Sequence, residues 1–278
     1  MSLVTKFGKT RSFLNWAFIF KIMAEVVSAD SGAKIDYRIL LVILFGVIGF
    51  QLYLNALLDE ADVENSIIVV SVISQLATAV AALVISKRYW GTHVFGKSYL
   101  ALSLAFFCVL IGEITYNVYL FVFEIDPYPS IADLFFFLLY PFSFVHLVFN
   151  IKFFNPQIRI SDKLWVIALA AAITLFYSFY SFSEMEVSFD SLYGIIFVAG
   201  ASAITSLAIL GTKILWKIPL GKAWFLLMIG IMLGTIGDVW YQYLEISESY
   251  DTSHVVNLFW YANYWVIVYS LYKHGKIF

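Results

Sequence analysis

Two acidic residues lie inside long apolar runs and have matching neighbours. Residues 112–116 read GEITY and residues 237–241 read GDVWY, so each acid follows a glycine and precedes a tyrosine by three positions. An ionised carboxylate at the centre of a bilayer costs at least about 2.5–3.5 kcal/mol. No lysine or arginine lies in the central part of either run. We therefore expect Glu113 and Asp238 to share a proton, accept hydrogen bonds or bind a cation.

The apolar run that follows each acid carries a second matching pair. Asp133 and Tyr140 are seven residues apart, as are Asn257 and Tyr264. The first acids differ by 125 positions (238 − 113) and the second pair by 124 (257 − 133). This spacing predicts two parallel repeats related by an axis along the membrane normal, with matching residues at matching depths.

Convergence of the two repeats would create one polar, tyrosine-lined pocket that opens to the extracytoplasmic side. The predicted ligand-binding residues are Glu113, Tyr116, Asp133, Tyr140, Asp238, Tyr241, Asn257 and Tyr264. Gln51 and Gln75 are expected to extend this polar network. Carboxylates and tyrosine rings both attract cations, so the expected ligand is a small cation or a proton-linked molecule.

Composition indicates the elements that position these residues. Hydrophobic residues make up 62% of the chain and charged residues 13%, which is typical of a polytopic membrane protein. We predict an all-α fold with eight transmembrane helices, at about 37–58, 66–87, 97–121, 131–154, 163–183, 191–215, 221–245 and 255–273. Residues 1–35 form an N-terminal segment, 36–155 the first four-span repeat, and 156–278 the second.

The basic residues predict the orientation. In an eight-span topology, all 17 lysine and arginine residues fall on one side, and the opposite connections carry only acids. The positive-inside rule then places both termini in the cytoplasm of a multi-pass cell-membrane protein. We expect the basic rim to contact anionic lipid head groups rather than nucleic acid.

The N-terminal segment is expected to contain an interfacial amphipathic helix. Phe13, Trp16 and Phe20 share one helical face, while Lys21 and Glu25 lie on the other. A secretory signal is the alternative, since basic residues precede the apolar stretch and small residues follow it.

Structural roles compete with the functional ones. Glu113 and Asp238 could be protonated acids hydrogen-bonded to neighbouring helices. Asp133 follows Ser130 by three residues, which predicts a capping box at the start of a helix. Gly230 and Gly234 are spaced for close helix packing.

Several functions are disfavoured by missing residues. His146 is the one histidine predicted within a span, so a bis-histidine haem is not expected. The predicted lysines lie only near span ends, so none is placed in the membrane interior to bind retinal. Cys108 is the sole cysteine, which excludes an intramolecular disulfide and a cysteine metal cluster. No metal site is predicted, and the cofactor, if any, is undetermined. No Walker, HExxH or GxSxG motif is present.

Part of the chain resembles the N-terminal multi-span sensor region of bacterial and archaeal signalling proteins. The residues concerned are GExxY, PYPSxAD and Tyr140-Pro141, then GDxWYxYLE and NLFWYANY. The resemblance covers roughly 97–150 and 225–275, and in such proteins a histidine-kinase or diguanylate-cyclase domain follows. Phe278 comes soon after the last predicted span, so the resemblance implies signalling to a separate cytoplasmic partner.

An acid in the third span and another in the seventh is also similar to the lysoplasmalogenase-type eight-span membrane hydrolases. That resemblance implies a catalytic acid–base pair of Glu113 and Asp238 acting on a lipid ether or ester. Three functions stay open at this stage: a membrane sensor or ligand-binding module, an intramembrane lipid hydrolase, and a proton- or cation-coupled transporter. The sensor is the leading hypothesis.

Overall fold

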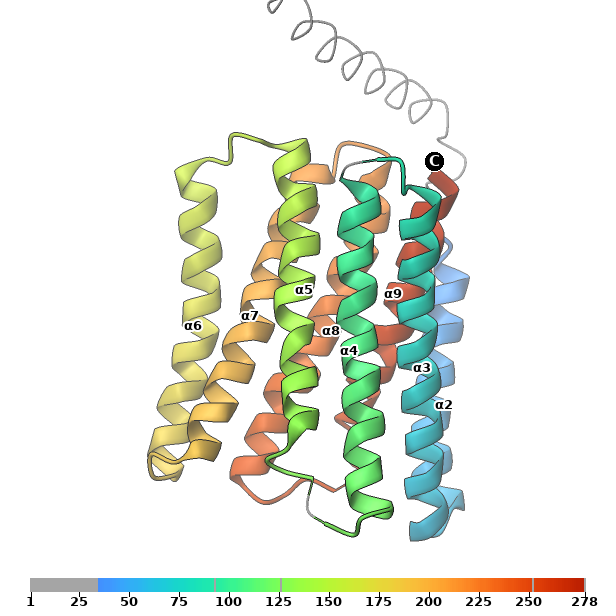
Figure 1. The fold of residues 1–278 in the computed structure, drawn as a ribbon, viewed down its shortest axis with the longest axis vertical. Helices are drawn as coiled ribbons and strands as arrows, with labels where there is room; N and C mark the ends of the chain where they lie inside the picture. The colour runs from blue at the N-terminus through green and yellow to red at the C-terminus, as the bar shows by residue number, and fades with distance from the viewer. Residues whose placement is uncertain (1–34, 93, 126, 252, 278) are drawn as a thin grey trace, which may run out of the picture.

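The computed structural model describes residues 35–92, 94–125, 127–251 and 253–277, and the regular secondary structure within them is entirely helical. The predicted all-α class is therefore confirmed for this part of the chain. The predicted interfacial helix lies outside the described residues. The helices are α2 (Tyr37–Leu57), α3 (Glu60–Arg88), α4 (Phe95–Phe121), α5 (Ile131–Phe154), α6 (Ile160–Glu184), α7 (Phe189–Leu215), α8 (Leu220–Ile246) and α9 (Asn257–Ile277) (Figure 1).

Seven of these helices, α2 to α8, are long and apolar enough to cross a membrane. The eighth predicted span corresponds to α9, a helix of 21 residues that is not among those seven. Polar residues such as Asn257, Asn263 and His274 reduce its mean hydropathy. It nevertheless packs extensively against α8 and also against α3.

Polar side chains at the helix starts explain where several helices begin. The Asp36 carboxylate accepts from the backbone nitrogen of Arg38 at 3.0 Å, and Asp59 caps α3 in the same way. Because of this cap, α3 begins at Glu60, six residues before the predicted start. Ser130 and Ser188 cap α5 and α7, each within a capping box.

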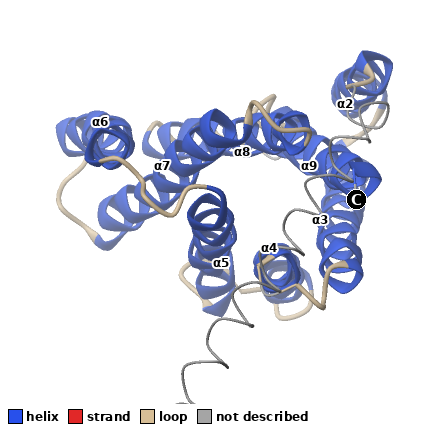
Figure 2. Cartoon of the chain, turned by 90° about the horizontal axis from the view of Figure 1, so that it is seen from above, coloured by secondary structure: helices blue, strands red, loops and turns tan. Residues whose placement is uncertain are grey.

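Six helices form a closed ring, and two lie outside it (Figure 2). Around the ring, α3 packs on α4, α4 on α5, α5 on α7, α7 on α8, α8 on α9, and α9 back on α3. Outside the ring, α2 packs mainly on α9 and α6 mainly on α7. The acid-bearing helices α4 and α8 are therefore both ring members.

The two ends of the bundle differ in charge. The connections after α2, α4, α6 and α8 meet at the lower end in Figure 1, which we call the acidic end. The connections after α3, α5 and α7 and the end of α9 meet at the other, basic end. Every described lysine and arginine lies near the basic end, from Arg38 to Lys276.

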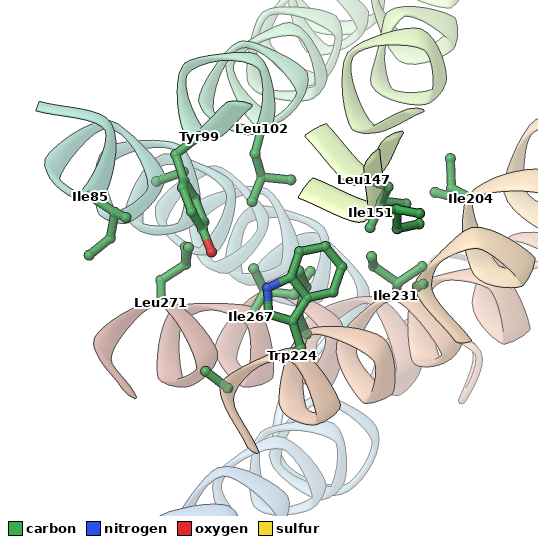
Figure 3. Close-up of a cluster of buried hydrophobic side chains, with 14 of the residues drawn as sticks. Ile85, Tyr99, Leu102, Leu147, Ile151, Ile204, Trp224, Ile231, Ile267 and Leu271 are labelled. Atoms are coloured by element: carbon green, nitrogen blue, oxygen red, sulfur yellow. The ribbon is translucent and has the colours of Figure 1, made fainter. Parts of the chain in front are cut away.

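An apolar layer fills part of the ring (Figure 3). Trp224 is 1% exposed and lies among Leu102, Leu147 and Ile231. Small residues permit this packing: a Cβ atom at Gly211 would lie 2.5 Å from the Trp224 ring. Close packing of this kind holds helices together in a bilayer, where the lipid is as apolar as the side chains.

The predicted close approach along α8 is confirmed. Side chains of α9 lie directly over the glycines of α8, with a Cβ at Gly230 placed 2.5 Å from Ile267 and one at Gly234 placed 3.2 Å from Asn263. This approach brings the next residues along both helices, including Asp238, into contact.

Candidate functional site

Asp238, on α8, accepts two hydrogen bonds from neighbouring helices. The indole nitrogen of Trp260 on α9 donates to Oδ1 at 2.9 Å. The hydroxyl of Tyr140 on α5 donates to Oδ2 at 3.5 Å. Tyr140 is 7% exposed, whereas Asp238 is half-buried. Each carboxylate oxygen therefore has a donor, and both donors come from ring helices.

The glycine before Asp238 makes room for one of these donors. A Cβ atom at Gly237 would lie 2.8 Å from the indole nitrogen of Trp260. The glycine before Glu113 has an equivalent role: a Cβ atom at Gly112 would lie 2.9 Å from the ring of Phe136 on α5. Each glycine thus leaves space for an aromatic side chain of the following helix to pack beside the neighbouring acid.

Glu113, on α4, is bonded to α3. The Gln75 amide donates to Glu113 Oε2 at 3.3 Å, and Gln75 itself is 3% exposed. Asn117, one turn further along α4, donates to the backbone oxygen of Glu113 at 2.8 Å. The predicted extension of the network to Gln75 is confirmed. Gln51 is also buried, but its amide donates to the backbone oxygen of Ser253 and not to either acid.

Tyr264 connects the surroundings of the two acids. Its hydroxyl is close enough to interact electrostatically with both Glu113 and Asp238, and the residue is 8% exposed. Its backbone oxygen accepts from the Thr78 hydroxyl at 3.3 Å, which joins α9 to α3. The two carboxylates have no hydrogen bond to each other, and Tyr264 lies near both of them.

An aromatic group covers the site toward the acidic end. The Tyr241 ring lies 5.5 Å from Trp260 and 4.8 Å from Tyr250, measured between ring centroids. The Tyr250 hydroxyl donates to Asn257 Oδ1 at 3.4 Å, and Tyr116 is close enough to both tyrosines to interact electrostatically. Burial raises the pKa of Tyr250, which lies outside the helices, so its phenol stays protonated at neutral pH.

Asp133 has the predicted capping role. One of its oxygens accepts from the backbone nitrogen of Ser130 at 2.7 Å, which completes the capping box of α5. Its other oxygen accepts from the Tyr193 hydroxyl on α7 at 2.9 Å. Tyr193 in turn is close enough to Asp238 to interact electrostatically. Both carboxylate oxygens of Asp133 therefore accept hydrogen bonds from the protein, and Asp133 lies at the edge of the site.

Positive charge is distant from these acids. Among the described residues, the one ion pair joins Lys213 to Asp162 at 2.7 Å, and it lies at the basic end. Within the same part of the chain, no group of three or more histidine, cysteine, aspartate or glutamate residues could hold a metal ion. The site thus offers carboxylate and phenol oxygens without a basic counter-charge.

Trp260 and Tyr193 were not among the predicted site residues. Trp260 follows Asn257 by three residues and precedes Tyr264 by four, so helical spacing places all three on one face. That spacing could have identified Trp260. Tyr193 has no comparable signal, because its contact with Asp133 depends on how α7 packs against α5.

A second buried polar cluster lies nearer the basic end. His274, one residue beyond the last predicted span, is 1% exposed within the bundle. Its ring and that of His146 each lie 4.7 Å from the ring of Tyr99. His146 is bonded through Nδ1 to the backbone oxygen of Ser98 at 3.0 Å. Two of the described histidines are therefore buried and packed on a shared tyrosine, whereas the sequence predicts only His146 within a span.

Two surface grooves lie away from the carboxylates. One, of about 610 Å³, is lined by Ile173 on α6 and by residues of α8 including Trp240 and Tyr243. The other, of about 490 Å³, lies between α2 and α3. Glu113 and Asp238 line neither groove.

Comparisons of this chain with protein-family models, with curated proteins and with solved structures find no match.

Proposed function

We propose that this protein is a membrane sensor that binds a proton or small cation at Glu113 and Asp238 and signals to a separate cytoplasmic partner. The observation that carries the proposal is the pair of half-buried carboxylates facing buried tyrosines without a basic residue nearby. Such a pair retains unbalanced negative charge in a medium of low dielectric, and a proton or cation supplies the missing charge.

The contacts of the two acids support two parallel repeats. Tyr140 and Tyr264 are 124 positions apart (264 − 140). Tyr140 donates to Asp238 of the other proposed repeat, and Tyr264 lies near Glu113 of the other repeat as well as Asp238 of its own. Phe136 and Trp260, the aromatics over the two glycines, are also 124 positions apart (260 − 136). In the proposed repeats, α3 corresponds to α7, α4 to α8 and α5 to α9. Exchanging these partners leaves the order of helices around the ring unchanged.

The site therefore lies between the proposed repeats rather than within one of them. Binding a cation between Asp238 and Tyr140, or near Tyr264, would change how α4 and α5 pack against α8 and α9. A ligand that prefers one packing arrangement shifts the population toward it. We propose that this shift is read at the basic end, and that α9 completes an eight-span topology with both termini in the cytoplasm.

The lipid hydrolase is our second candidate. It requires one acid to be ionised and placed to activate water. Both oxygens of Asp238 already accept from protein donors, and Glu113 has a separate donor on α3. This arrangement favours stabilising a bound charge over activating water, so the sensor is preferred.

The experiment measures thermal unfolding of the purified protein over a series of pH values, amines and metal ions. We expect at least one of these series to shift the melting temperature of the wild type. The double variant Glu113→Gln/Asp238→Asn should lose that shift. As a matched control, Glu184→Gln/Glu186→Gln removes two exposed acids outside the site and should keep it. Equal responses of all three proteins would refute the proposal.

A further inference from the structure

The groove between α2 and α3 opens at the acidic end of the bundle. Its volume is about 490 Å³, and its walls come from the last turns of α2 and the first turns of α3. The groove exists because α2 packs mainly on α9 and only slightly on α3. The contact of Phe50 with Tyr261, with ring centroids 5.4 Å apart, holds α2 in this position.

The chemistry of the walls changes with depth. Asp62 lies in the first turn of α3, Ser66 one turn deeper, and Val69 and Val70 one turn deeper again. Val70 lies eight positions after Asp62, which corresponds to about 12 Å along the helix. Phe50 adds an aromatic wall from α2. The groove thus presents a carboxylate, then a hydroxyl, then hydrocarbon, which is the order of polarity along a membrane lipid.

The charge at the mouth indicates the head group. Asp62 is exposed, Asp59 and Glu64 lie within three residues of it, and every described lysine and arginine lies toward the other end of the bundle. Tyr53, which is 45% exposed, lines the same groove and offers an aromatic face to a cation. A positively charged group is therefore attracted at this position, and an anionic one is repelled.

We propose that the α2–α3 groove binds one membrane lipid whose head group carries an ammonium. The ammonium would lie against Asp62 and Tyr53, and the first part of an acyl chain would lie against Val69, Val70 and Phe50. Ser66 is placed to donate a hydrogen bond to an ester oxygen between these two regions. The site contains neither Glu113 nor Asp238, so it does not depend on the proposed sensor function.

The test uses photo-crosslinking of the full chain in nanodiscs. Two probe lipids carry the same diazirine acyl chain, with a phosphocholine head in one and a phosphoglycerol head in the other. We expect the choline probe to label peptides covering residues 50–70 about five-fold more than the glycerol probe, the ratio given by an interaction of about 1 kcal/mol. Asp62→Asn should reduce this ratio to about one.

Two further variants test the acyl part of the site. Val69→Trp places a bulky ring in the groove from a position that is 55% exposed, so the fold should tolerate it. It should abolish labelling of residues 50–70 by both probes. Ile167→Trp, on the exposed face of α6 with 64% exposure, should leave that labelling unchanged. Equal labelling of wild type by the two probes, or labelling that survives Val69→Trp, would overturn the proposal.

Discussion

The indole nitrogen of Trp260 donates a hydrogen bond to the carboxylate of Asp238 at 2.9 Å. This bond joins α9 to α8. It forms only because residue 237 is a glycine, which lets the indole lie directly over the backbone of α8. The glycine and the acid are therefore parts of one packing arrangement.

Removing the indole donor should weaken the contact between α8 and α9. Trp260→Phe keeps an aromatic ring but leaves Asp238 with the Tyr140 hydroxyl as its donor. We expect the free energy of unfolding to fall by about 1–2 kcal/mol, the size of an interhelical hydrogen bond in model membrane peptides. Trp265→Phe is the control, since this residue lies on the same helix and is 36% exposed. Equal losses in the two variants would show that the bond contributes nothing specific.

Methyl groups at the two acid-adjacent glycines should be poorly tolerated. Gly237→Ala forces Trp260 away from Asp238, and Gly112→Ala forces the Phe136 ring away from α4. We expect each to lower the free energy of unfolding by about 1–3 kcal/mol, as overpacking does elsewhere. Gly46→Ala, with nothing within 4 Å of its new Cβ, should be neutral or stabilising by up to about 1 kcal/mol. Unfolding titrations in mixed micelles provide the measurement.

Double-mutant cycles should distinguish the two buried tyrosines. Tyr264→Phe is expected to show coupling to both Glu113→Gln and Asp238→Asn, because this tyrosine lies near both acids. Tyr140→Phe is expected to couple mainly to Asp238→Asn. Coupling free energies should reach about 0.5–1.5 kcal/mol for residues in one network. Additive effects of Tyr264→Phe with either acid variant would contradict the bridging position given to this tyrosine.

The proposed topology predicts which side of the membrane each end of α9 faces. In a Cys108→Ala background, Asp251→Cys lies in the α8–α9 connection and Lys276→Cys lies near the end of α9. A membrane-impermeant maleimide added to intact cells should label the first variant. It should label the second only after the membrane is permeabilised. Labelling of both from the same side would show that α9 does not cross the bilayer.

Local features of the chain determined the helices. Long apolar stretches, interrupted by acids or bases, predicted the positions of α2 to α9 to within a few residues for most ends. The α5 capping box was also predictable, because Ser130 and Asp133 are only three residues apart and need no distant partner. The separation of charge into an acidic and a basic end follows from the same helix order, since consecutive helices alternate in direction.

The partners of the polar residues were decided by tertiary structure. Asn257 and Tyr264 marked the polar face of α9, yet the role of Trp260 depends on how closely α9 approaches Gly237. His274 belongs to the last turn of α9, and only its packing against Tyr99 places it inside the bundle. A helix forms from bonds within four residues, so its limits can be read along the chain. The rotation and neighbours of a helix depend on interlocking side chains from several helices at once, and this information is spread over residues far apart in the sequence.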